Sequence, residues 1–153
     1  MTEQDALKRL AARCSAAEHC QYEALEKLRQ WGIDDVASAR VMQYLTEHHF
    51  IDDERYCRAF VNDKVRYSKW GRKKSEQALW QKHIDPQLQQ QVLDDVSDET
   101  YAEVLRPQLA AKRRQTKANN EYELNMKLIR WAMGRGYTLD VIRQCLETDI
   151  DDV

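Results

Sequence analysis

The residues with the clearest chemical character form a basic stretch near the middle of the chain, in which aromatic side chains stand among positive charges. Its members are Lys64, Arg66, Tyr67, Lys69, Trp70, Arg72, Lys73 and Lys74. Basic side chains neutralise phosphates and aromatic faces stack on unpaired bases, so the mixture is typical of a surface that binds single-stranded nucleic acid. A structural alternative stays open: Trp70 packs at the junction of helical units, and the charges only solvate a loop.

A second basic group lies farther along the chain. It consists of Lys112, Arg113, Arg114 and Lys117, with Arg130 and Arg135 on the helix expected next. If both groups lie on one face, they form a continuous stripe that attracts nucleic acid. The sequence does not determine that alignment, and the alternative is a helix face that the charges merely keep solvated.

The remaining polar clusters do not predict a metal site. The acids from Asp52 to Glu54 are consecutive at an expected helix start, so they cannot all point at one ion, and capping is the better interpretation. Cys14, His19 and Cys20 lack a second ligand pair at the spacing of a zinc finger. The sequence therefore predicts no metal.

Known catalytic patterns are missing from the sequence as well. It contains no glycine-rich phosphate loop, no nucleophile elbow and no paired-histidine zinc motif. His48, His49 and His83 have no serine or cysteine nucleophile in a recognisable setting. We therefore expect a protein without enzymatic activity and without a cofactor.

A short pattern that recurs three times indicates how these residues are positioned. At residues 32–34, 83–85 and 136–138, a small or polar residue is followed by an apolar residue and then by a helix N-cap. The apolar residues Ile33 and Ile84 lie 51 positions apart, and Tyr137 follows Ile84 after 53. Such a period predicts tandem copies of one helical unit, which bury their apolar stripes by stacking on their neighbours.

We expect an all-α protein of three tandem three-helix repeats in an elongated, curved array. The expected repeats are residues 1–49, residues 50–96, which hold the first basic group, and residues 97–153. Pro107 is expected to interrupt and kink a helix of the third repeat.

Local capping signals support these helices. Thr2 with Asp5, and Asn120 with Glu123, have the spacing of capping boxes. Each pair therefore predicts a helix that begins at the residue after the cap.

Composition agrees with a helical protein. Four glycines and two prolines among 153 residues, with 33% charged and 42% hydrophobic residues, favour helices with short connections. No apolar run resembles a signal peptide or membrane span, so a cytoplasmic location without membrane contact is expected. The four scattered cysteines are expected to be reduced.

The net charge of −2 conceals blocks of alternating sign. Lysine and arginine against aspartate and glutamate give −4 for residues 1–63, +5 for 64–93, −5 for 94–105, +6 for 106–136 and −4 for 137–153. A polyanion responds to the two basic blocks rather than to the mean.

The stretch from Phe50 to Ile84 resembles the RecX family of RecA regulators. In that family an aromatic residue and two aspartates precede a helix with an aromatic and a small residue, followed by a basic stretch, a glycine and a second helix that ends in a Lys-Gly-Ile-like corner. The corresponding residues here are Phe50, Asp52, Asp53, Tyr56, Ala59, Phe60, Arg66, Gly71, Leu79, Lys82 and Ile84. The chain departs from the pattern at His83, which replaces the usual glycine, at Cys57, where alanine is common, and at Pro107.

The resemblance implies tandem three-helix repeats and a non-enzymatic protein of DNA repair, recombination and the SOS response. Such a protein binds the RecA nucleoprotein filament and modulates RecA's recombinase and ATPase activity, usually by inhibition. It also contacts single- and double-stranded DNA without sequence preference, and we expect a monomer. Two alternatives stay open: a helical DNA-binding regulator that acts without RecA, and an adaptor whose charge blocks meet only proteins.

Overall fold

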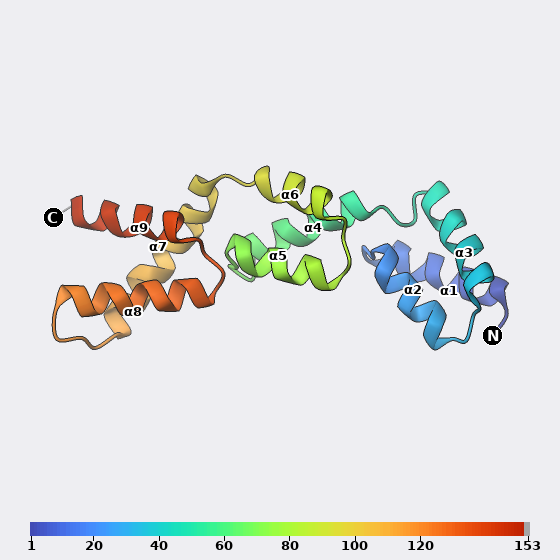
Figure 1. The fold of residues 1–153 in the computed structure, drawn as a ribbon, viewed down its shortest axis with the longest axis horizontal. Helices are drawn as coiled ribbons and strands as arrows, with labels where there is room; N and C mark the ends of the chain where they lie inside the picture. The colour runs from blue at the N-terminus through green and yellow to red at the C-terminus, as the bar shows by residue number, and fades with distance from the viewer. Residues whose placement is uncertain (152–153) are drawn as a thin grey trace. The chain divides into compact units, whose positions relative to one another are not determined.

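The computed structural model describes residues 1–151, with side chains described as far as Leu146. Every regular element in this part of the chain is an α-helix (Figure 1). The helices are α1 (Glu3–Ala16), α2 (Gln21–Gln30), α3 (Asp35–Glu47), α4 (Asp53–Arg66), α5 (Arg72–Gln81), α6 (Pro86–Asp94), α7 (Asp98–Gln115), α8 (Glu121–Gly134) and α9 (Leu139–Asp151). The predicted all-α class is confirmed. None of the helices described is both long and apolar enough to cross a membrane.

The three predicted corners have the same backbone structure. Gly32, His83 and Gly136 adopt positive φ angles of 74°, 55° and 95°. At each corner the next residue's amide donates to the carbonyl of the residue five positions before it, at 3.0, 3.3 and 3.2 Å. This is the hydrogen bond of a Schellman helix end, which favours glycine. His83 occupies it without being glycine, and its ring stacks on Tyr22 with centroids 4.2 Å apart.

Helix starts follow the predicted capping chemistry. The Thr2 hydroxyl accepts from the Asp5 amide at 3.1 Å, and the Asp5 carboxylate accepts from the Thr2 amide at 3.4 Å, which completes a capping box. Asn120 accepts from the Glu123 amide at 2.8 Å. The Glu123 carboxylate, however, accepts from Asn119 rather than from Asn120, at 3.1 Å. The second box is therefore displaced by one residue.

The consecutive acids at the start of α4 cap two different helices. Asp52 accepts from the Arg55 amide at 3.1 Å, so it caps α4 itself. Asp53 accepts from the Gln21 amide at 2.9 Å, at the first residue of α2. Burial raises the pKa of Asp53 above its usual value. The geometry favours capping over metal binding, as the sequence indicated.

Pro107 does not interrupt its helix, so that part of the prediction is wrong. Helix α7 runs through it for 18 residues. A proline leaves the carbonyl four residues earlier without its backbone donor. That carbonyl belongs to Glu103, and both Glu103 and Pro107 are exposed, so water can solvate it. In the same turn the Gln108 side-chain amide donates to the Val104 carbonyl at 3.1 Å.

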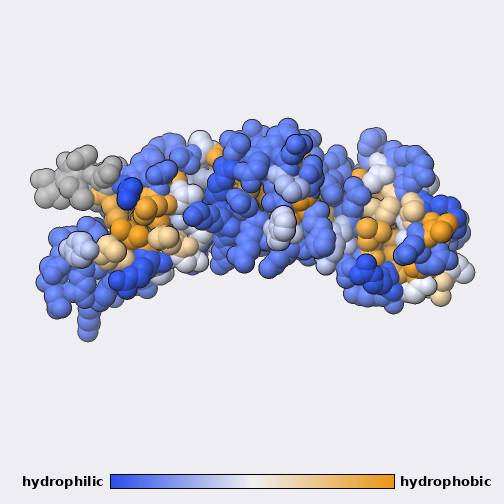
Figure 2. Space-filling view, in the orientation of Figure 1, coloured by the Kyte–Doolittle hydropathy of each residue, from blue (hydrophilic) through white to orange (hydrophobic). Residues whose placement is uncertain are grey.

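The chain divides into two compact units. The first consists of Met1–Phe60 with Leu79–Gln89, and in it α1 and α2 both pack on α3. Its buried core is formed by Ala6, Leu10, Ala24, Leu28, Val41, Met42, Leu45 and Ile51. In the view of Figure 2, hydrophobic side chains gather over α1–α3, and mainly hydrophilic ones are seen over α4–α6.

The second unit consists of Val61–Ala78 with Gln90–Val153, of which the last two residues lie outside the described part of the chain. Helices α7, α8 and α9 pack on one another in this unit (Figure 1). Side chains buried in it include Val61, Val65, Val92, Leu93, Tyr101, Leu105, Leu109, Leu128, Tyr137, Val141, Ile142 and Cys145. Both predicted basic groups belong to this unit.

Candidate nucleic-acid interface

The first basic group begins in the last turn of α4, crosses a short loop and ends in the first turn of α5. Arg66, Lys69, Lys73 and Lys74 are exposed. Tyr67 is 78% exposed at the start of the loop. The loop therefore presents one open aromatic side chain among several cations.

Trp70 holds two of the lysines in place. The Lys64 Nζ lies 4.7 Å and the Lys74 Nζ 4.9 Å from the centroid of its half-buried ring. Each contact contributes about 0.5 to 1 kcal/mol when exposed, and it fixes an otherwise flexible ammonium group. Stacking of Trp70 on a base would compete with these contacts. The arrangement therefore favours neutralisation of phosphate by the two lysines beside Trp70. The exposed ring of Tyr67 is then the one available for stacking on a base.

Arg72 is turned towards α6. Its guanidinium donates to Asp94 at 2.7 Å and to Gln90 at 3.0 Å. Arg66 in turn donates to Asn62 at 2.8 Å. Asp94 stands 22 positions from Arg72, and sequence reasoning did not anticipate it as a partner. The negative charge of Asp94 beside the guanidinium weakens the attraction of Arg72 for phosphate.

A tight backbone joint connects the start of α5 to the corner after α8. The Gly71 amide donates to the Arg135 carbonyl at 2.9 Å, and the Lys73 amide donates to the Gly136 carbonyl at 2.9 Å. A Cβ at Gly71 would overlap the backbone of Gly136 and Tyr137. A Cβ at Gly136 would stand 2.5 Å from the Lys74 Cβ. Only glycine at both positions allows this approach.

The buried Tyr137 side chain also stabilises the joint through two hydrogen bonds. Its hydroxyl donates to the Lys69 carbonyl at 2.8 Å and accepts from the Gln108 side chain at 3.0 Å. Burial raises the pKa of Tyr137, so the hydroxyl stays protonated and able to donate. The loop of the first basic group is thus fixed to the third predicted repeat.

Two residues of the second basic group, of which Arg135 also takes part in the joint, contact a second tryptophan. Arg135 and Lys112 lie over the Trp131 ring, with their charged groups 5.3 and 5.8 Å from its centroid. Arg135 also donates to the Ser68 carbonyl at 3.4 Å. Sequence reasoning missed Trp131, although it stands four residues before Arg135 and so on the same helix face.

We call these six residues the tryptophan–cation cluster. It contains Lys64, Trp70, Lys74, Lys112, Trp131 and Arg135. Its two halves are linked by the hydrogen bond between Gly71, which follows Trp70, and Arg135. Two predicted basic groups therefore contribute to one local arrangement.

The other predicted residues of the second group differ in their surroundings. The Arg113 guanidinium donates hydrogen bonds to the Glu121 carboxylate at 3.2 Å and to the Asn125 side-chain carbonyl at 3.3 Å. Arg114, Lys117 and Arg130 are exposed. The Lys117 carbonyl accepts from Lys127 at 2.7 Å, which brings a further cation beside this segment.

Other chemistries find little support in the part of the chain that the structure describes. No group of three or more histidine, cysteine or acidic side chains there could hold a metal ion. None of the four cysteines forms a disulfide, and Cys14 alone among them is not buried. Burial raises the pKa of Cys57 to about 11, so this thiol is a poor nucleophile.

Comparison with known families identifies two segments. Residues 52–93 match the model described as "RecX, second three-helix domain", and residues 99–146 match "RecX, third three-helix domain". Together these segments cover more than half of the chain. The basic groups and both glycines of the joint fall within them.

Relatives that match 80% and 90% of this chain bear the name "Regulatory protein RecX". One from Clostridium botulinum is 28% identical over 125 residues, which are 80% of this chain and 58% of the relative. One from Vibrio campbellii is 26% identical over 138 residues, which are 90% and 87% of the two chains. This chain thus spans just over half the length of the clostridial relative. A crystal structure of RecX from Lactobacillus salivarius has the same fold, with a TM-score of 0.86 at 19% identity over 99% of this chain and 97% of that one.

Proposed function

The chain belongs to the RecX family of regulatory proteins, which are not enzymes, and from this premise we propose that it binds the RecA nucleoprotein filament. In this proposal it inhibits RecA's recombinase and ATPase activity while the tryptophan–cation cluster contacts DNA. The observation that carries the DNA contact is the glycine joint, which brings cations from both basic groups together.

The cluster supports contact with phosphate rather than with particular bases. Its charged groups are ordered by two indole rings before any ligand arrives, which lowers the entropic cost of binding. Phosphate contacts fix position without reading sequence. We therefore expect binding to single- and double-stranded DNA without sequence preference. In this proposal the protein is a cytoplasmic monomer, and its three repeats are residues 1–49, 50–96 and 97–153.

Salt dependence tests the DNA contact. For single strands the logarithmic slope falls by about 0.7 for each phosphate that is neutralised, so Lys64→Gln with Lys74→Gln should flatten it by about 1.4. Lys8→Gln with Arg9→Gln, which removes two exposed cations from α1, is the matched control and should leave the slope unchanged. Equal slopes for both double variants would remove the cluster from the proposed interface.

RecA capture tests the remaining part of the proposal. The protein is immobilised and incubated with a bacterial lysate, with and without added single-stranded DNA, and partners are identified by mass. Retention of RecA supports the proposal. Retention of DNA alone would favour a regulator that acts without RecA, and retention of other proteins alone would favour an adaptor.

A further inference from the structure

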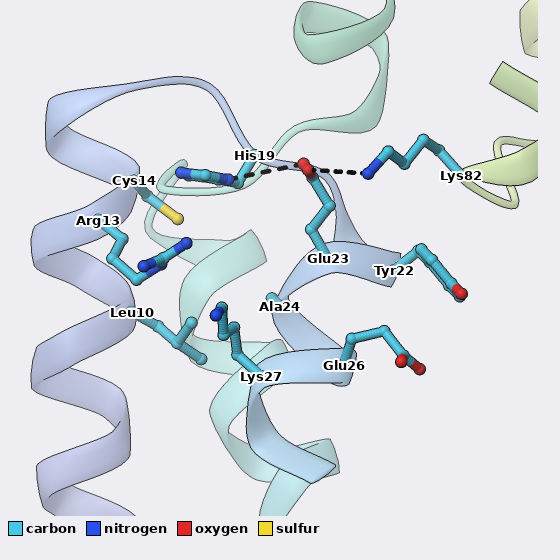
Figure 3. A pocket seen from close by; sticks show the side chains of 10 residues that line it. All are labelled: Leu10, Arg13, Cys14, His19, Tyr22, Glu23, Ala24, Glu26, Lys27 and Lys82. Carbon is cyan, nitrogen blue, oxygen red and sulfur yellow. Dashed lines mark hydrogen bonds and ion pairs between the residues drawn. The ribbon is translucent and has the colours of Figure 1, made fainter. Parts of the chain in front are cut away.

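A small cavity lies between α1 and α2 in the first unit, and none of its lining residues belongs to either basic group. Its volume is about 200 Å³ (Figure 3). Leu10 and Ala24 are buried at its base, and Cys14 and Tyr22 line it from the two helices. These four residues give the cavity apolar walls beside its six polar and charged lining residues, and it has room for a group the size of an amino-acid side chain.

The acids that line the cavity already have partners. Glu23 accepts from Lys82 at 3.3 Å and from the Cys20 amide at 3.1 Å. Burial opposes its ionisation, but these two donors outweigh burial, so the pKa of Glu23 lies below its usual value. Glu26 pairs with Arg29 at 2.6 Å. Neither acid is left to neutralise another cation in the cavity.

Two cations of the lining remain without such a partner. Figure 3 shows Arg13 reaching from α1 and Lys27 from α2 towards the same space. Within the described residues, neither side chain makes a hydrogen bond or an ion pair. Two like charges that face one cavity repel each other, and an anion placed between them relieves that repulsion.

We propose that this cavity binds a carboxylate side chain, aspartate or glutamate, from a protein partner. Arg13 and Lys27 would pair with the carboxylate, and the apolar walls would cover its methylene groups. This inference does not depend on the proposed DNA contact, because the cavity and the tryptophan–cation cluster share no residue.

Charge and exposure favour a protein over other sources of an anion. Residues 1–63 carry a net charge of −4, which repels a polyanion such as DNA but acts less on one short carboxylate. Arg13 is exposed, and exposed ion pairs contribute little by themselves. An isolated carboxylate therefore binds weakly but measurably at high concentration, and a protein partner supplies further contacts around the cavity.

Cys14 provides a reporter within the unmodified chain. Its thiol lines the cavity, and the other three cysteines are buried. The rate of its reaction with N-ethylmaleimide is measured with the capped tripeptide acetyl-Ala-Glu-Ala-amide, with the same peptide containing glutamine, and with inorganic phosphate. The glutamate peptide should slow labelling about threefold at twice its Kd, by the factor 1 + [L]/Kd.

Charge-removing variants complete the test. Arg13→Gln with Lys27→Gln should abolish protection by the glutamate peptide, whereas Lys8→Gln with Arg9→Gln should retain it. Amide shifts of Cys14 and Ala24 in a ¹⁵N spectrum provide a readout that does not depend on thiol reactivity. No protection by the glutamate peptide, equal protection by the glutamine peptide or by phosphate, or protection that survives loss of both cations would each overturn the proposal.

Discussion

Replacing Gly71 with alanine should open the joint between α5 and the corner after α8. The added Cβ would overlap backbone atoms of Gly136 and Tyr137, and backbone cannot move aside as a flexible side chain can. The two backbone hydrogen bonds across the joint, both 2.9 Å long, would lengthen or break.

The expected loss follows from these two terms. Each hydrogen bond contributes about 1 kcal/mol, and forcing an extra carbon into a packed site costs about 1 to 3 kcal/mol. We therefore expect Gly71→Ala to lower the free energy of unfolding by about 3 to 5 kcal/mol. For a chain of this size the melting temperature should fall by about 6 to 20 °C.

Gly134→Ala provides a matched control in the same unit. Gly134 ends α8, and an added Cβ meets no atom within 4 Å. Alanine is the better helix former, so this variant should be more stable than the wild type by about 0.5 to 1 kcal/mol. Urea denaturation followed by circular dichroism measures both variants. If Gly71→Ala loses no more stability than Gly134→Ala, the close approach at the joint is not the source of its stability.

Two further predictions concern acidic residues. Asp94→Asn should release Arg72 for phosphate and steepen the salt slope of single-strand binding by up to about 0.7. The control variant Asp140→Asn on α9 should leave the slope unchanged. An unchanged slope for Asp94→Asn would show that Arg72 does not reach DNA. Burial raises the pKa of Asp53 in the folded chain, so the folded state binds a proton at Asp53 more tightly than the unfolded state does. The stability that comes from this difference is fully present below the unfolded pKa and is lost as pH rises through the folded value. Asp53→Asn should therefore raise the melting temperature at about pH 7 but not at about pH 3, and a gain of equal size at both pH values would contradict this cause.

Local chemistry explains which features the sequence could predict. The corners at Gly32, His83 and Gly136 depend on turn residues and on one hydrogen bond within six residues, so their pattern is visible in the chain. The box of Thr2 with Asp5 is equally local. Pro107 was misjudged because the carbonyl that loses its donor, that of Glu103, lies at an exposed position where water can solvate it.

Contacts between distant segments explain what could not be predicted. Gly71 and Gly136 meet only after the helices pack, and nothing in the neighbourhood of either glycine indicates the other. The pairing of Arg72 with Asp94 arises in the same way. The basic groups could be found from composition, but which lysines Trp70 would hold depended on the turn between α4 and α5.

The central claim is tested most directly by RecA's DNA-dependent ATP hydrolysis on single-stranded DNA, measured while this protein is titrated against a fixed amount of RecA. One molecule bound in a filament affects many RecA subunits, whereas competition for DNA requires enough protein to cover the strand. We predict inhibition when the protein is present in substoichiometric amounts relative to RecA. ATP hydrolysis that stays unchanged with the protein in excess over RecA would contradict the account.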